Sequence, residues 1–298
     1  MLLQELNQKY SIKNHITFSR EKHMIVAELK SQYSTAKVSL YGAQVLSFIP
    51  NGEKDLLFVS KESFYQEGKA IRGGIPVCWP WFGAHSTDQN KPSHGFARLS
   101  NWQVIKTSSK NDELSLQLEL NDSEYTRLIW PYKFKTIISI TIGRTLSVDL
   151  TTANLDEKPF TITSALHSYF NVSDSEKITI SGLKNTNYVD DVLNMESLQE
   201  KSLLSLQGEI DRRYIDTLTS CCITDPGYQR KIQVSKKGSK TTVIWNPGSK
   251  LAMKMIDLGN HEYTSMVCIE AANSLNNSIS ILPGQSHSLS TILELASN

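Results

Sequence analysis

Two titratable side chains of this sequence stand in apolar surroundings. Glu270 directly follows four apolar residues, 266–269, and a carboxylate at the edge of a buried strand is costly unless it is paired or used in chemistry. Desolvation there would raise its pKa toward that of a general base. His167 lies in the strand-like run 160–171, and histidine can donate or accept a proton near neutral pH. Each residue alone also fits a structural role, but together they suggest an acid–base pair across a pocket.

The segment 71–83, IRGGIPVCWPWFG, does not have the pattern of a strand. Its glycines and prolines leave little room for regular sheet, and the glycine pair 73–74 allows a positive φ or a close approach to a ligand. A rigid aromatic loop suits a sugar, whose C–H faces stack on rings while its hydroxyls seek polar partners. The alternative is that Trp79, Trp81 and Phe82 fill one end of the core, which is the commoner role of a single tryptophan.

Two arginines lie in or near this segment. Arg72 adjoins the glycine pair, where an unpaired guanidinium would be costly. Arg98 ends the run 93–98, SHGFAR, which also carries His94. Two arginines on neighbouring loops could bind a phosphate, because a planar guanidinium donates parallel hydrogen bonds to anionic oxygens. Both could equally form structural salt bridges, and the spacing does not decide between these alternatives.

The composition excludes some classes of partner. The 298 residues carry 31 basic and 30 acidic side chains, a net charge of +1, so there is no basic surplus for a nucleic-acid backbone. The four cysteines show no metal-ligand spacing, which argues against a zinc site and favours a reducing compartment. There is no basic, apolar leader and no run long enough to span a bilayer. We therefore expect a cytoplasmic protein that does not bind membranes.

Alternating apolar and polar residues predict the elements that position these side chains. The pattern is clear over 114–120, 146–150 and 289–295, and it is typical of antiparallel sheet with one buried face. Polar turn sequences separate the runs. We expect one all-β domain over residues 1–298, built of two large packed antiparallel sheets.

Helical signals are few. The segments 60–67, 120–128 and 257–263 could each form a short helix, and the polar residues 122–124 offer capping side chains.

Several motifs resemble those of a known family. RGGIPVCWPWFG, HGFAR, LHSYFNV, the Tyr-Ile-Asp at 214–216 and CIEAAN, in this order over residues 71–273, resemble the glucose-6-phosphate 1-epimerases, or hexose-6-phosphate mutarotases. These form a branch of the aldose 1-epimerase superfamily. The first string is specific to the branch, whereas HSYFN is shared with galactose mutarotases. The resemblance implies a galactose mutarotase-like β-supersandwich, which agrees with the alternation.

The resemblance also implies an activity and a catalytic pair. His167 would be the general acid that protonates the ring oxygen, and Glu270 the general base that takes the proton of the anomeric hydroxyl. The ring opens, the C1–C2 bond rotates, and reclosure gives the other anomer. This chemistry requires no metal or other cofactor, and we expect none. The expected partner is a small hexose 6-phosphate, and we expect a monomer.

The remaining site residues are implied in the same way. Arg72 and Arg98 would bind the 6-phosphate, Asp216 would hold sugar hydroxyls, and His94 would line the pocket. Ser93 is a departure, because the family usually has Gln at this position. A shorter hydroxyl there loses a direct contact or makes it through water, so the substrate preference is open at this point. Two other functions also stay open: a mutarotase of unphosphorylated aldoses, and a sugar-phosphate binding protein without catalysis.

Overall fold

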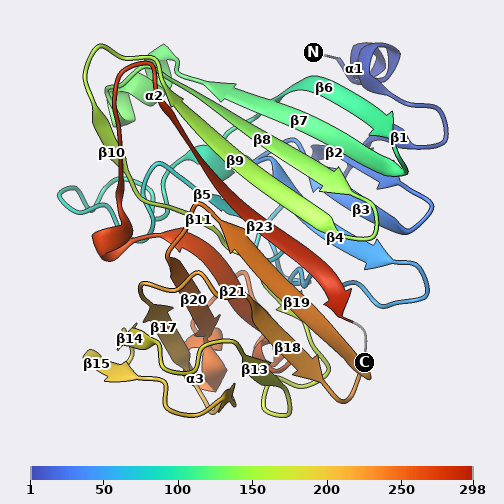
Figure 1. The fold of residues 1–298 in the computed structure, drawn as a ribbon. Coiled ribbons are helices and arrows are strands. Elements are labelled where there is room, and N and C mark those ends of the chain that lie inside the picture. Colours follow the sequence, from blue (N-terminus) through green and yellow to red (C-terminus); the bar gives the residue numbers. More distant parts are fainter. Residues whose placement is uncertain (1, 297–298) are drawn as a thin grey trace.

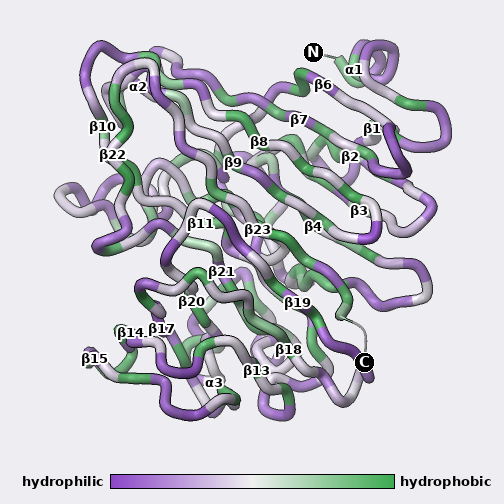
Figure 2. The backbone as a smooth tube through the Cα atoms, viewed as in Figure 1, coloured by the Kyte–Doolittle hydropathy of each residue, from purple (hydrophilic) through white to green (hydrophobic). Residues whose placement is uncertain are grey.

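The computed structural model describes residues 2–296, and antiparallel strands form most of it (Figure 1). One sheet contains β6 (Gln103–Lys110), β7 (Glu113–Asn121), β8 (Phe134–Ile142), β9 (Leu146–Asn154), β13 (Thr179–Ser181), β16 (Leu203–Leu204), β18 (Cys221–Asp225), β19 (Arg230–Lys237) and β23 (Ser286–Ala296). Its strand order is β16-β13-β18-β19-β23-β9-β8-β7-β6. The four leucines of β7 are buried while the residues between them are partly exposed. This alternation, also visible in Figure 2, is the one that the sequence predicts.

A second sheet lies against the first and carries the candidate site. It contains β5 (Val77–Cys78), β11 (Ser164–Leu166), β12 (Tyr169–Asn171), β14 (Asn187–Asp190), β15 (Met195–Leu198), β17 (Ile210–Tyr214), β20 (Thr241–Asn246) and β21 (Met266–Asn273). The order is β15-β14-β17-β20-β21-β11-β5, and β12 also pairs with β21. Because β21 has neighbours on both sides, its backbone groups are largely paired within the sheet.

Two smaller sheets complete the layers. One is a meander of β1 (Ile16–Glu21), β2 (Met24–Lys30), β3 (Ser34–Ser39) and β4 (Gln44–Pro50). In Figure 1 it lies, in blue, behind the green strands β6–β9. The other pairs β10 (Phe160–Ile162) with β22 (Ile279–Ile281). The prediction of an all-β fold of large antiparallel sheets is confirmed.

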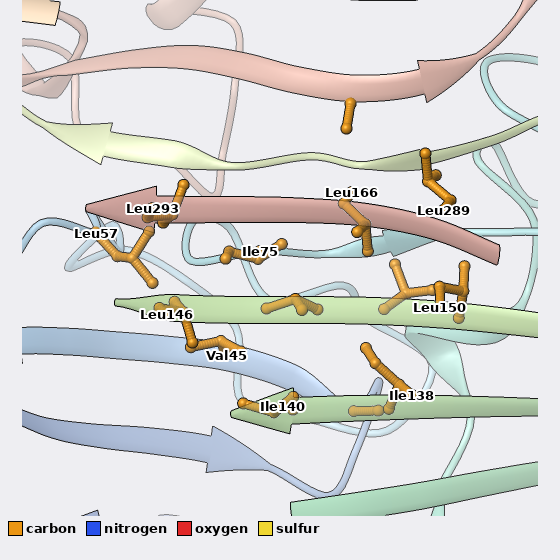
Figure 3. Close-up of a cluster of buried hydrophobic side chains, with 14 of the residues drawn as sticks. Val45, Leu57, Ile75, Ile138, Ile140, Leu146, Leu150, Leu166, Leu289 and Leu293 are labelled. Carbon is orange, nitrogen blue, oxygen red and sulfur yellow. The ribbon is translucent and has the colours of Figure 1, made fainter. Parts of the chain in front are cut away.

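Aliphatic side chains from these sheets meet in one core (Figure 3). Strands β8, β9 and β23 of the nine-stranded sheet face residues of β4 and β11 and of the loops near them. The labelled residues are Val45, Leu57, Ile75, Ile138, Ile140, Leu146, Leu150, Leu166, Leu289 and Leu293. Each is nearly or fully buried, and burying one such side chain contributes about 1.5–3 kcal/mol. The core thus fixes β11, and with it the start of the segment that contains His167.

Helices are short, and the predictions for them are only partly right. The structure has α1 (Leu3–Tyr10), α2 (Glu124–Ile129) and α3 (Gly248–Ala252), with 3-10 turns at Ala97–Leu99, Glu262–Ser265 and Leu275–Asn277. The helix predicted at 120–128 is α2, capped by Ser123, and the one at 257–263 is reduced to a 3-10 turn. Among residues 2–296, no helix is long and apolar enough to cross a membrane.

The helix predicted at 60–67 is wrong, because tertiary partners take the polar groups of this segment. The Ser60 N–H donates to the Arg72 carbonyl, and the Arg72 N–H donates to Ser63 Oγ. Ser60 Oγ donates to Glu262 at 2.6 Å. These bonds hold the segment as a loop beside Arg72.

Candidate active site

The register of the site sheet places His167 opposite Glu270. β11 pairs with β21 so that Ala165 lies opposite Ala272, and β12 pairs with the same strand in the same register. His167 lies between β11 and β12, two residues beyond Ala165, and therefore faces Glu270. The His167 Nε2 and Glu270 Oε1 atoms are 3.3 Å apart. Two side chains far apart in the sequence thus meet through one antiparallel ladder.

Strand β21 is buried on both faces, and Glu270 lies on the face away from the main core. Val267 and Ile269 pack into the core between the sheets. Glu270 points the other way, as side chains alternate along a strand. On that face a cluster of apolar side chains is formed by Ala272 of β21 and by residues of the strands beside it, Cys78, Ala165 and Val243. Glu270 is 2% exposed, so its carboxyl group is almost fully removed from bulk water.

Burial dominates the electrostatics of the pair. It raises the pKa of Glu270 well above its ordinary value, and the charge of Asp211 raises it further. It lowers the pKa of His167 well below its ordinary value, and His94 and Arg72 add to this effect. Both shifts favour an uncharged pair that holds a single proton.

Each member of the pair also has a free polar atom. Glu270 Oε2 and His167 Nδ1 are buried without a hydrogen-bond partner among residues 2–296. Buried polar atoms without partners are uncommon in native proteins and often mark functional sites. Glu270 Oε2 can therefore accept a proton from a ligand while Oε1 faces His167.

Arg72 is held beside the pair by two partners. Its Nε and Nη2 donate to Asp257 Oδ2 at 3.1 and 2.9 Å, and its Nη1 donates to the Tyr169 hydroxyl at 3.0 Å. The Tyr169 ring stacks on His167 with centroids 4.7 Å apart. Arg72 thus forms a salt bridge with Asp257. The guanidinium has five N–H groups, so these three bonds leave two for a ligand.

The glycine pair after Arg72 is required by the protein's own backbone. A Cβ on Gly73 would lie 2.3 Å from the Phe58 carbonyl oxygen, and one on Gly74 would lie 2.1 Å from that of Val45. Both glycines have positive φ, which favours glycine. The close approach expected from the sequence is thus an approach to neighbouring chain segments, and it anchors Arg72.

The 93–98 segment brings a second histidine and a second arginine toward the pair. The His94 and His167 ring centroids are 6.0 Å apart. Burial, then Arg98 and Arg72, lower the pKa of His94 to about 3, so this ring is neutral near pH 7. The Gly83 N–H donates to His94 Nδ1 at 3.3 Å, a bond that assigns the proton to Nε2.

Arg98 has no carboxylate partner among residues 2–296. Its Nη2 donates to the Ser93 carbonyl at 2.8 Å, and its Nε is buried without a partner. Ser93 is exposed, and it contacts Arg98 through its backbone. The structure therefore brings Arg72, Arg98 and His94 near the pair, with Ser93 at the edge of the same loop.

Asp216, which the resemblance assigns to sugar hydroxyls, is exposed in the turn that follows β17, at φ +52. Asp211, within β17, lies opposite Trp245, which in turn lies opposite Cys268 of β21. Asp211 therefore shares a face of the sheet with Glu270, and its charge acts on that carboxyl group. The sequence feature that could have identified Asp211 is the position of an acidic residue inside a strand rather than in a turn.

Known proteins are similar to this chain in sequence and in fold. The sequence model of "Aldose 1-epimerase" matches residues 26–294. An Escherichia coli K12 protein named "Putative glucose-6-phosphate 1-epimerase" is 36% identical over 238 residues, which cover 80% of this chain and 79% of that protein.

Solved structures of similar proteins have the same fold. The crystal structure of a "putative mutarotase" from Salmonella typhimurium matches with a TM-score of 0.90 at 29% identity and covers 97% of this chain and 96% of that one. A "galactose mutarotase related enzyme" from Lactobacillus acidophilus matches with a TM-score of 0.71 at 15% identity, over 91% of this chain and 97% of that one, and shows the shared fold.

Proposed function

This chain belongs to the aldose 1-epimerase family and is an isomerase of the mutarotase type, and we propose that it interconverts the α and β anomers of glucose 6-phosphate or a close hexose 6-phosphate. The observation that carries the proposal is the 3.3 Å approach of His167 to Glu270, with Arg72 bound to Tyr169, which lies two residue pairs away in the same register. The name of the Escherichia coli relative points to the same substrate.

The pair supplies both proton transfers of the reaction. Proton transfer between Glu270 and His167 converts the neutral pair into a carboxylate and an imidazolium. Glu270 Oε2 then takes the proton of the anomeric hydroxyl, and the O–H electrons form the C1 carbonyl. The C1–O5 bond breaks with its electrons on O5, which takes a proton from His167. Rotation about C1–C2 and the reverse steps give the other anomer, and a final proton transfer from His167 to Glu270 restores the neutral pair.

The rate acceleration that the reaction requires agrees with what an acid, a base and substrate orientation can contribute. Sugar anomers already interconvert unaided in water, so the rate acceleration required is modest. A positioned acid and base contribute roughly 10²–10⁴-fold, and orientation of the anomeric hydroxyl against Glu270 adds to this.

The phosphate would bind between the two arginines. Asp257 and Tyr169 fix the Arg72 guanidinium and leave two of its N–H groups free. Arg98 lacks a competing carboxylate among residues 2–296, and both arginine charges act on His94 and His167. Two positive charges close to a neutral acid–base pair favour an anionic group on the substrate. Asp211, in place of Asp216, would hold sugar hydroxyls.

Exchange NMR between anomers tests the substrate. We expect kcat/KM for glucose 6-phosphate to exceed that for glucose or galactose by at least about tenfold, since charge-assisted hydrogen bonds contribute about 1.5–3 kcal/mol each. Equal turnover of free sugars would overturn the phosphate assignment and leave a mutarotase of unphosphorylated aldoses. Binding of glucose 6-phosphate without exchange would indicate a binding protein.

The pH dependence tests the shared proton. Activity requires the state in which the pair carries one titratable proton. Burial lowers the pKa at which the pair gains a second proton, and it raises the pKa at which the pair loses its only one. We expect a broad plateau through neutral pH. Since Asp211 raises the pKa of Glu270, Asp211→Asn should move the alkaline limb of kcat/KM to lower pH, by up to about one unit.

The control for this experiment is Asp216→Asn, which removes an exposed carboxylate from the following turn and should leave the limb in place. The profile is recorded above about pH 7, where a phosphate monoester has completed its own titration. An alkaline limb that stays unchanged in Asp211→Asn would contradict this account of the pair.

A further inference from the structure

A cavity of about 730 Å³ lies beside the candidate active site. Its lining includes Phe82, His94, Asp211, Arg213 and Ser274. His94 and Asp211 also belong to the candidate active site, so the cavity continues from it.

Strand register places Arg213 on the catalytic face of the sheet. Arg213 of β17 lies opposite Val243 of β20, and Val243 lies opposite Glu270. Residues paired across a sheet share a face. Arg213 therefore projects from the same surface as the carboxyl group of Glu270, two strands away.

Ser274 in the cavity wall and Arg72 lie in opposite directions from Glu270 along β21, whereas Asp211 in the same wall lies level with Cys268. Arg72 contacts Tyr169, which pairs with Cys268, two residues before Glu270. Ser274 follows the end of β21, four residues after Glu270. A sugar with its anomeric centre at Glu270 and its phosphate toward Arg72 would therefore direct its other edge toward the cavity.

Two buried polar atoms in the cavity wall lack partners among residues 2–296: Ser274 Oγ and Arg213 Nε. Ser274 is only 4% exposed. A buried hydroxyl or guanidinium N–H without a partner is costly. A polar ligand in the cavity would satisfy both atoms.

The wall of the cavity carries charges of both signs. Arg213 Nη2 donates to Asp191, which also lines the cavity. An anion would face the carboxyl groups of Asp191 and Asp211, and a cation would face Arg213. Uncharged hydroxyls can instead donate to the carboxylates and accept from the guanidinium.

An apolar surface lies beside these polar groups. Phe82 is half-buried, packs on the apolar cluster around Val243 and contacts the His94 ring. An aromatic face next to planar polar side chains suits a sugar ring, which has C–H faces and a rim of hydroxyls. We propose that this cavity is a subsite for a second, uncharged sugar ring, linked to the reacting hexose on the side away from Arg72.

This inference rests on the proposed anomer exchange, so its test uses the same assay. The probes are glucose and four reducing disaccharides of glucose, with 1→2, 1→3, 1→4 and 1→6 linkages. We expect at least one 1→2- or 1→3-linked disaccharide to exceed glucose in kcat/KM by about tenfold, the effect of one or two net hydrogen bonds. Arg213→Met and Ser274→Ala should each remove most of this preference and leave turnover of glucose 6-phosphate unchanged.

The matched control is Arg144→Met, which removes an exposed arginine from the turn between β8 and β9 and should change nothing. Glucose 6-phosphate turnover in every variant verifies the fold. If glucose 6-phosphate is turned over but no disaccharide exceeds glucose, the subsite is wrong and the proposed function stands. If glucose 6-phosphate is not turned over, the proposed function fails. Binding of the disaccharides, measured by saturation-transfer NMR, then tests the subsite independently. Equal signals from wild type and Arg213→Met would overturn the subsite.

Discussion

Glu270→Gln should lower kcat for anomer exchange of glucose 6-phosphate by roughly 10²–10⁴-fold, the contribution of a positioned acid and base. Glutamine preserves the shape of the side chain and can still face His167, but it cannot take the proton of the anomeric hydroxyl. Binding should stay close to wild type, because the proposed phosphate contacts lie on Arg72 and Arg98. Saturation-transfer exchange NMR measures the rate, and calorimetry measures the affinity.

The matched control for this variant is Glu294→Gln, an exposed carboxylate on β23, which should leave both quantities unchanged. Equal exchange rates in wild type and Glu270→Gln would contradict the assignment of the base. A parallel loss of binding and exchange would instead indicate that Glu270 supports the fold of the pocket.

Arg72→Met should reduce kcat/KM for glucose 6-phosphate by about 10–100-fold, because charge-assisted hydrogen bonds contribute about 1.5–3 kcal/mol. Turnover of free glucose should change far less, since the variant removes no group that reaches the anomeric centre. The ratio of the two kcat/KM values is the measured quantity. It separates loss of a phosphate contact from general damage to the site.

This substitution also leaves Asp257 without its partner, and a buried carboxylate left alone destabilises the protein. The side chain of Asp257 is 16% exposed, so the double variant Arg72→Met/Asp257→Asn is the better-matched protein. It should show the same loss of phosphate preference with a smaller loss of thermal stability. An equal effect on phosphorylated and free sugar in the double variant would contradict the phosphate contact.

The sheets could be predicted because alternation reports burial directly. The leucines of β7 and β9 alternate with polar residues, and each pattern became a strand of the nine-stranded sheet. The segment 60–67 could not be predicted, because its conformation depends on distant partners such as Glu262. Local sequence does not show where such partners will lie.

The residues of the candidate site differ in how far the sequence predicts them. His167 and Glu270 stand out because titratable groups in apolar runs are costly, and the register confirms that they meet. Asp211 is not singled out by the sequence, because only the pairing of β17 with β20 and of β20 with β21 shows that its side chain shares the face of Glu270. The ion pair of Arg72 with Asp257 joins residues far apart in the sequence, and nothing near either residue predicts the other.

The single register that aligns β11, β12 and β21 has a consequence for how such a protein can diversify. The proposed acid and base, His167 and Glu270, lie opposite each other in one register inside the fold, whereas several groups that would recognise the rest of the substrate lie on loops around it, such as 93–98. Insertions and substitutions in those loops can change which substituents are accepted while the reacting atoms stay in place. The same chemistry can thus be inherited unchanged by descendants that serve different sugars.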